Sequence, residues 1–314
     1  MTSLTSICSK RVHLHPCSVE KMPFIDGLYA TGMYELNETT KDRAGCVSVY
    51  ASPGSLLSSH SIDAGILDMK FNGSLLGCAL STSRLCVIKY AHGSNTESCT
   101  IESVSTSSPE EDADDGLFLS LDWSSQSTLE QTAPVDNCFI ATSTQNGAVK
   151  IYSCSETDGV LQFGSYKSMY DVHKLHGETQ PVWIVAFDPH SCSQNGCPNS
   201  ILTGGDDSMF KLWDVRTMND GHDCVDGGIR PTAIGKYHQA GVTTAAFHPT
   251  NPHVVVTGSY DQNLCVWDKR NLRSPVTAVE TGKHCIVQYL YLYSYSSVCD
   301  ACGFLCVRIV FIST

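Results

Sequence analysis

Short apolar runs separated by polar turns recur along the chain from about residue 18 to residue 282. The clearest runs lie at 242–247, 254–257 and 264–267, and Gly, Asp, Asn or Pro residues flank them. Runs of four to eight residues bounded by turn-forming residues are typical of β-strands. The pattern therefore predicts an all-β fold made of short strands joined by tight turns.

One unit is written twice, over residues 176–270. Each copy begins with a histidine, continues through two apolar runs and a Gly-x-x-Asp turn, and ends in Trp-Asp. The two terminal tryptophans, Trp213 and Trp267, lie 54 residues apart, somewhat more than the forty-odd residues usual for a WD-type propeller blade. Because one such unit cannot bury its own apolar strands, units of this kind pack against one another. The repeat predicts a WD40 β-propeller.

Four polar or aromatic residues of one copy align with four of the other when the two Gly-x-x-Asp turns are superposed. The aligned pairs are His176 with His238, Thr203 with Thr257, Asp207 with Asp261, and Trp213 with Trp267. The four types resemble the network that braces WD repeats, in which these side chains satisfy one another's hydrogen bonds. A buried polar group without such a partner costs about 1–3 kcal/mol. We therefore predict a structural role for all eight residues.

Three weaker units precede this pair. They cover residues 18–50, 64–90 and 117–152, and the turn of the third is marked by Asn146-Gly147. Residues 92–116, which are rich in Ser, Thr and acidic residues, predict a solvated loop insertion. The sequence thus predicts about five recognisable blades in residues 18–282, after an N-terminal extension formed by residues 1–17.

The repeat pattern is lost after Gly282, and residues 283–314 predict a divergent tail in place of the last blades. The propeller is therefore expected to be incomplete at its C-terminus. A membrane span in the tail is disfavoured because Asp300 and Arg308 interrupt its apolar residues. A zinc site at Cys299 and Cys302 is disfavoured because no second spaced pair supports it. We expect no metal.

Length and charge narrow the function further. A chain of 314 residues is long enough for one propeller with a sizeable core. A formal net charge of −12 argues against a nucleic-acid surface, which needs clustered Lys and Arg, and suits a cationic partner.

The cysteines and the N-terminus indicate a compartment. Most of the 16 cysteines stand beside apolar residues, which favours small buried thiols in a reducing cytosol over disulfides. Residues 1–21 contain no apolar secretory segment. We expect a cytoplasmic protein that does not bind membranes.

Six motifs occur in an order more specific than WD repeats alone. They are GMYEL at 32–36, ILDMK at 66–70, LSLDW at 119–123, WIVAF at 183–187, GGDD at 204–207, and GSYD at 258–261 followed by WDKR at 267–270. Over about residues 18–282 the chain resembles the diphthine methyl ester hydrolase family, the WD-repeat proteins of diphthamide biosynthesis. The resemblance implies seven blades and a cytoplasmic hydrolase that needs no cofactor and removes the methyl ester from methylated diphthine on elongation factor 2.

Two features depart from the family. Pro181 stands where the family has a glutamate before the tryptophan of the fourth motif, so Glu178 replaces that glutamate only if the loop folds back. Only 32 residues follow Gly282, which is too few for two further blades of about 40 residues each.

The sequence offers candidates for ester hydrolysis. It contains neither the Gly-x-Ser-x-Gly of α/β-hydrolases nor a His-Glu-x-x-His zinc motif, so a carboxylate or an imidazole would have to activate water. Asp206 is not needed for bracing, and its counterpart in the next copy is Tyr260. Trp183 is likewise unmatched, because Thr243 takes its place. The loop before the first strand and the turn after the second lie on the same face of a propeller, so these residues and Glu178 are expected to meet at one mouth of the channel.

We hypothesise that Trp183 and Tyr260, with Glu178 nearby, bind the trimethylammonium group of diphthine. A cation–π contact of this kind contributes roughly 0.5–2 kcal/mol. Asp206 would orient the attacking water, and the other candidate is a loop histidine, His176 or His238, that is released from bracing. The alternative is that Trp183 only packs and Asp206 is an exposed turn residue. A non-catalytic scaffold that binds other proteins also remains open, because a fold alone does not determine function.

Overall fold

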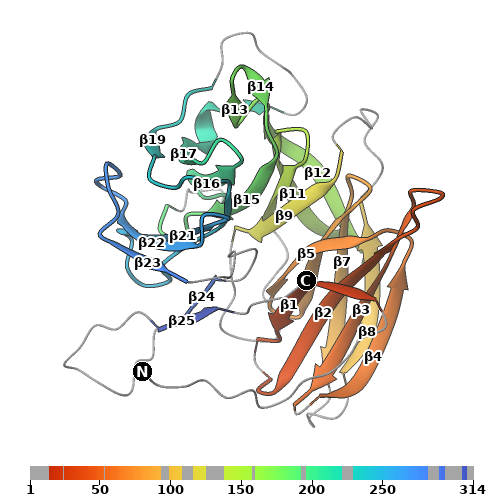
Figure 1. The fold of residues 1–314 in the computed structure, drawn as a ribbon. Helices are drawn as coiled ribbons and strands as arrows, with labels where there is room; N and C mark the ends of the chain where they lie inside the picture. The colour runs from red at the N-terminus through yellow and green to blue at the C-terminus, as the bar shows by residue number, and fades with distance from the viewer. Residues whose placement is uncertain are drawn as a thin grey trace. The chain divides into compact units, whose positions relative to one another are not determined.

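The described part of the chain folds into β-strands joined by turns and loops, with one short 3-10 helix (Figure 1), which confirms the predicted all-β class. The computed structural model describes residues 14–23, 25–52, 54–92, 99–107, 116–124, 138–157, 160–191, 196–220, 229–281, 290–293 and 306–309. Two compact units can be distinguished. The first consists of residues 1–121, 125–136 and 154–163, and the second of residues 122–124, 137–153 and 164–314.

Within the described residues, five sheets share one antiparallel arrangement in which four strands pair in chain order; each is called a blade below. The first holds β1 (His15–Lys21), β2 (Leu28–Leu36), β3 (Arg43–Ala51) and β4 (Ser55–Ile62). The second holds β5 (Ile66–Asn72), β6 (Leu75–Leu80), β7 (Leu85–His92) and β8 (Cys99–Thr106). The third holds β9 (Phe118–Trp123), β10 (Cys138–Thr144), β11 (Val149–Thr157) and β12 (Val160–Met169), and β18 (Asn219–Asp220) adds a fifth strand.

The last two blades contain the repeated unit. The fourth consists of β15 (Val182–Phe187), β16 (Ser200–Gly205), β17 (Phe210–Asp214) and β19 (Ala233–Gly235), and a short 3-10 helix, η1 (Val215–Thr217), follows β17. The fifth consists of β20 (Val242–Phe247), β21 (Val254–Ser259), β22 (Asn263–Asp268) and β23 (Thr277–Glu280). The prediction of about five blades is confirmed.

The ends of the predicted propeller are less fully described. β1 begins at His15, three residues before the predicted start of the first blade. In the predicted tail, β24 (Leu290–Tyr293) pairs with β25 (Cys306–Ile309), and the other residues of 283–314 lie outside the described part of the chain. The predicted extension, the tail and the missing blades therefore stay predictions.

The loop predicted for residues 92–116 is wrong in its first half. Residues 99–106 form β8, which pairs with β7 from His92↔Cys99 to Cys86↔Thr106. Buried or half-buried residues alternate with exposed ones along this strand. An outer strand is half solvated, so its exposed face carries the same Ser, Thr and Glu residues as a loop. The acidic core of the predicted loop, residues 108–115, lies outside the described residues.

The core of the second unit contains the two repeated tryptophans. Trp213 packs with residues of the third and fourth blades, among them Val149 and Val185. Trp267 is fully buried between the fourth and fifth blades, where its ring lies 4.7 Å from that of Phe210, centroid to centroid. Aromatic side chains bury more apolar area than other residues. These two rings are therefore anchors between blades.

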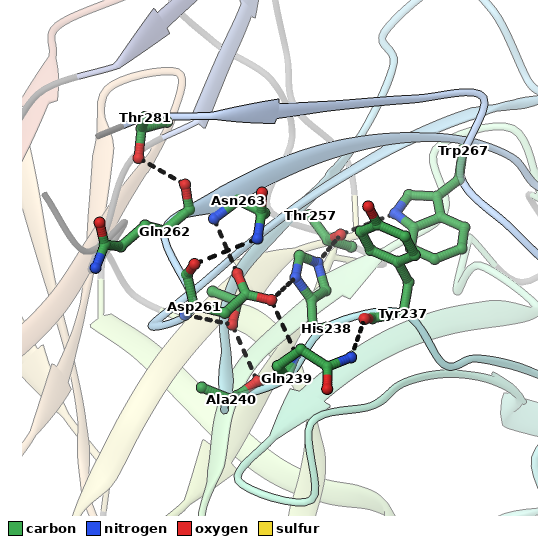
Figure 2. Close-up of polar contacts among 11 residues, drawn as sticks. Tyr237, His238, Gln239, Ala240, Thr257, Asp261, Gln262, Asn263, Trp267 and Thr281 are labelled. Atoms are coloured by element: carbon green, nitrogen blue, oxygen red, sulfur yellow. Dashed lines mark hydrogen bonds and ion pairs between the residues drawn. The ribbon is translucent and has the colours of Figure 1, made fainter. Parts of the chain in front are cut away.

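A chain of hydrogen bonds braces the fifth blade (Figure 2). Trp267 Nε1 donates to Thr257 Oγ1 over 2.8 Å, and the Thr257 hydroxyl lies 2.8 Å from His238 Nε2. His238 Nδ1 lies 3.0 Å from Asp261 Oδ2, which also accepts the Gln239 backbone N–H at 2.9 Å. The bonds join the loop before β20, the strand β21, the turn after it and the strand β22. We call His238, Thr257, Asp261 and Trp267 the fifth-blade brace.

The fourth blade has the same brace, but its histidine is His173, so the prediction of His176 was wrong. Trp213 Nε1 donates to Thr203 Oγ1 at 2.8 Å, and that hydroxyl lies 2.9 Å from His173 Nε2. His173 Nδ1 lies 2.7 Å from Asp207 Oδ1. We call His173, Thr203, Asp207 and Trp213 the fourth-blade brace.

An inserted hairpin explains the error. β13 (Lys174–Leu175) and β14 (Glu178–Thr179) pair across a two-residue turn, His176-Gly177, in which both φ angles are positive, at 53° and 89°. Two-residue hairpin turns of this kind need positive φ at both central positions. The insertion lengthens the loop between His173 and β15 and leaves His176 exposed at its tip.

The fourth-blade brace also holds a cation. Lys211 Nζ donates to Asp207 Oδ2 at 2.8 Å and to the Val172 carbonyl at 2.9 Å. The corresponding residue of the fifth blade is Cys265. Burial alone would raise the pKa of Asp207, but the hydrogen bonds and charges of His173 and Lys211 hold it below its usual value.

The two histidines of the fourth-blade loop are expected to differ sharply on substitution. His173→Ala leaves the buried Thr203 hydroxyl and Asp207 carboxylate each short of a partner and should lower the free energy of unfolding by about 2–4 kcal/mol. His176→Ala removes an exposed side chain and should change it by less than about 0.5 kcal/mol. Urea unfolding followed by tryptophan fluorescence measures both. Equal losses would contradict the assignment of His173 to the brace.

The braces are also expected to make stability depend on pH. Each atom has a partner when the histidine is neutral, because Nδ1–H then donates to the aspartate while Nε2 accepts the threonine O–H. Burial lowers the pKa of His173 and of His238 below the usual 6.5. Below about pH 6.5 the unfolded chain therefore binds more protons than the folded chain, and the free energy of unfolding falls as the pH decreases.

We expect a loss of up to about 1.4 kcal/mol per pH unit from each of the two histidines as the pH falls below about 6.5. The lowered pKa values of Asp207 and Asp261 lie below 3.8, so these groups add to the loss only in stronger acid. Urea midpoints measured between about pH 7.5 and pH 5.5 test this. A flat profile over that interval would rule out a brace that requires neutral histidines.

Candidate functional site

Trp183 owes its position to a β-bulge at the start of β15. In the pairing of β15 with β16, Val182 lies opposite Gly205 and Ile184 opposite Gly204, so Trp183 is the extra residue. A bulge re-aims the side chain of the extra residue. β20 has a bulge at the same place, where Thr243 corresponds to Trp183. The geometry is thus shared by both blades, whereas the residue that occupies it differs.

Asp206 receives the Trp183 side chain. It is the first residue after β16, and its Oδ1 accepts the indole N–H of Trp183 at 2.7 Å. The following residue, Asp207, is buried in the fourth-blade brace, whereas Asp206 is half-buried. Among the described residues, Trp183 is the one hydrogen-bond donor to the Asp206 carboxylate. Its N–H contacts one of the two carboxylate oxygens. Asp207 therefore braces the fourth blade, whereas the neighbouring Asp206 binds the Trp183 side chain.

Tyr260 completes the group. It is the first residue after β21 and so corresponds to Asp206 in the fifth blade. Its ring centroid lies 6.2 Å from that of Trp183, and the two planes meet at 89°. Its backbone N–H donates to the carbonyl of Gly241 at 3.1 Å, and 36% of the residue is exposed. We call Trp183, Asp206 and Tyr260 the Trp183 cluster. The structure brings these three predicted residues together.

The other predicted site residues have different positions. His176 and Glu178 are exposed on the β13–β14 hairpin, where the Glu178 carbonyl accepts Gln180 Nε2 at 3.2 Å. His238 is 5% exposed, and both of its ring nitrogens are bonded in the fifth-blade brace. Taking a proton from water would cost His238 one of these bonds. Asp206 therefore remains the best placed of the candidate bases.

The sequence analysis missed two residues that shape this region. His173 was missed because the hairpin insertion moves it away from the aligned position. Gly241 was missed because its carbonyl bond to Tyr260 and its closeness to Asp206 depend on the packing of two blades. For His173, a search for a brace histidine on either side of a possible hairpin turn would have found it.

The described residues have three general features. They contain no group of three or more His, Cys, Asp or Glu side chains arranged to hold a metal ion. No helix among them is both long enough and apolar enough to cross a membrane. The cysteines described as free include eight that are buried, at positions 46, 78, 86, 99, 138, 154, 197 and 265.

The model of the WD domain, G-beta repeat, family matches residues 169–214 and 230–268. A diphthine methyltransferase homolog of Dictyostelium discoideum is 30% identical over 230 residues, which cover 70% of this chain and 53% of that protein. The human diphthine methyltransferase is 29% identical over 227 residues, which cover 70% of this chain and 43% of its own length. The chain thus contains two WD repeats and is similar, over about 70% of its length, to proteins named diphthine methyltransferase.

The predicted resemblance and the predicted WD40 β-propeller class are thereby confirmed. The chain spans about half the length of these diphthine methyltransferases. Human WD repeat-containing protein 37 is 32% identical over 110 residues, which cover 35% of this chain and 19% of that protein. That similarity concerns a shorter part of the chain.

Proposed function

We propose that this chain hydrolyses the methyl ester of methylated diphthine on elongation factor 2, as a cytoplasmic step of diphthamide biosynthesis. The similarity to proteins named diphthine methyltransferase supports the substrate. The observation that carries the chemistry is the Trp183 cluster, in which two aromatic rings and a carboxylate meet.

The rings suit a trimethylammonium group. Such a group has no N–H to donate, so a protein recognises it through aromatic faces and negative charge. The planes of Trp183 and Tyr260 meet at 89° with the ring centroids 6.2 Å apart, a pair called the aromatic corner below, and Asp206 accepts the indole N–H. A cation against each ring gains roughly 0.5–2 kcal/mol, and more as water is excluded. The net charge of −12 adds a general attraction for cationic surfaces.

Asp206 is the proposed general base. The Trp183 N–H holds one carboxylate oxygen, and the other can accept a proton from water. The water oxygen then bonds to the ester carbonyl carbon, the bond from that carbon to the methoxy oxygen breaks, and methoxide leaves with a proton as methanol. A positioned base contributes about 10²–10⁴-fold in rate. The reaction consumes only water, so it needs no methyl donor or cofactor.

Asp206→Asn is the sharpest test of this role. The variant keeps an oxygen that accepts the Trp183 N–H but cannot take a proton, so methanol release should fall by about 10²–10⁴-fold while the urea midpoint stays unchanged. Asp268→Asn, at the end of β22, is the matched control and should release methanol at the wild-type rate. A folded Asp206→Asn variant with undiminished turnover would remove Asp206 from the mechanism. Turnover that occurs only with a methyl donor would replace hydrolysis by methyl transfer.

Tetramethylammonium tests the aromatic corner separately. We expect it to compete with the substrate, raising KM without changing kcat, because it occupies the place of the trimethylammonium group. Trp183→Ala and Tyr260→Ala should each raise KM severalfold and weaken inhibition by tetramethylammonium. Tyr29→Ala, a change of a half-buried ring in β2, should leave the inhibition constant unaltered. Equal inhibition of the cluster variants and the wild type would exclude the corner as the cation site.

A second candidate is a non-catalytic scaffold. The similarity of 110 residues to WD repeat-containing protein 37 favours it, because a likeness that extends beyond the diphthine methyltransferases points to a general binding platform. A stable complex with elongation factor 2 and no methanol release would support the scaffold. Methanol release from the methylated factor would support the hydrolase.

A further inference from the structure

We infer that Gly241 is a positioning residue for Asp206, because the absence of a side chain at residue 241 leaves room for the Asp206 carboxylate. The inference rests on the proposed function only in giving Asp206 a chemical role. Gly241 immediately precedes β20, in the loop that joins the His238 part of the fifth-blade brace to the strand.

Asp206 and Tyr260 occupy the space next to Gly241. A methyl group built on its Cα would overlap Asp206 Oδ1 and would lie 3.4 Å from Asp206 Cα and 3.4 Å from Tyr260 Cδ2. The atom that it would overlap is the oxygen that accepts the Trp183 indole N–H. An added side chain and this hydrogen bond therefore compete for one place.

Backbone conformation does not require glycine here. Gly147 and Gly177 have φ angles of 81° and 89°, in the left-handed region that disfavours other residues. Gly241 is absent from that region, so alanine can adopt its backbone conformation. What the position demands is room beside Asp206.

The structure also indicates how the chain would accommodate alanine. Asp206 Oδ1 is at the end of a side chain that can rotate, whereas the loop backbone is fixed by two bonds. Tyr260 N–H donates to the Gly241 carbonyl at 3.1 Å, and Ser259 Oγ donates to the Ala240 carbonyl at 3.0 Å. The carboxylate should therefore turn away, lose the Trp183 N–H and leave the loop in place. Because the fifth-blade brace is not touched, the chain should still fold.

Gly241 consequently links the two blades that build the cluster. It comes from the fifth blade, makes room for an acid of the fourth and binds the tyrosine of its own blade through its carbonyl. Its counterpart before β15 is Pro181, and the residue corresponding to Asp206 in the third blade is Gln145. The pair formed by Asp206 of the fourth blade and Gly241 of the fifth is therefore not repeated between the third and fourth blades.

The full-length Gly241→Ala variant tests the inference. We expect kcat for methanol release to fall at least tenfold with less than a threefold change in KM, and the urea midpoint to match the wild type. Subtracting the spectrum of the matching Trp183→Phe variant isolates the emission of Trp183, which should shift as it does in Asp206→Ala. Gly164→Ala, at an exposed position of β12, is the control, because its methyl group would meet only the end of a serine side chain, Ser153 Oγ at 2.9 Å.

The double variant Asp206→Asn with Gly241→Ala separates positioning from a general structural effect. If glycine acts through Asp206, adding Gly241→Ala to Asp206→Asn lowers kcat no further. An additional tenfold loss, or unfolding of Gly241→Ala alone, would overturn the inference.

The two hypotheses can fail separately. An inactive Asp206→Asn together with a wild-type Gly241→Ala and unshifted Trp183 emission would overturn the role of Gly241 alone. A fully active Asp206→Asn would overturn the proposed base, and the Trp183 emission of Gly241→Ala would still decide whether glycine positions the carboxylate.

Discussion

The hydroxyl group of one buried threonine in each repeated blade is the point on which the rest of the second unit depends. Thr203 and Thr257 are both fully buried, and each hydroxyl accepts an indole N–H and faces a histidine nitrogen. Water cannot replace these partners at such sites, so every group left unpaired carries its full desolvation cost. Through the histidine the bonds reach the turn aspartate, which fixes the turn in space. Asp206, its neighbour in the chain, is fixed with it.

The candidate site uses positions next to the brace. Asp206 and Tyr260 each precede a brace aspartate, and Trp183 occupies a bulge that the fifth blade fills with Thr243. The brace holds the backbone at these positions in place, but their side chains make none of its hydrogen bonds. The side chains can therefore differ between blades without loss of the fold. Blades with the same brace can in this way carry different functional side chains at the positions beside it.

The sequence predicted those parts of the molecule that repeat. The Thr, Asp and Trp members of both braces follow from aligning the two copies, and so does the meeting of Trp183, Asp206 and Tyr260. His173 does not, because a hairpin inserted in one copy disturbs the alignment at that point. β8 does not, because a half-solvated outer strand and a loop share one composition. Gly241 does not either, because a requirement for space arises only when two blades pack.

Lys211 changes how far the charges of the fourth blade act. Its ammonium group lies against Asp207, so that buried carboxylate and this cation cancel at a distance. Of the two consecutive acids, Asp206 alone is left to project a field beyond the surface. An approaching cation is therefore attracted by the single negative charge of Asp206 rather than by the charges of two acids. Dissolved salt screens this attraction within about 8–10 Å at physiological ionic strength. Capture of the proposed cationic ligand would then depend mainly on contact with the rings.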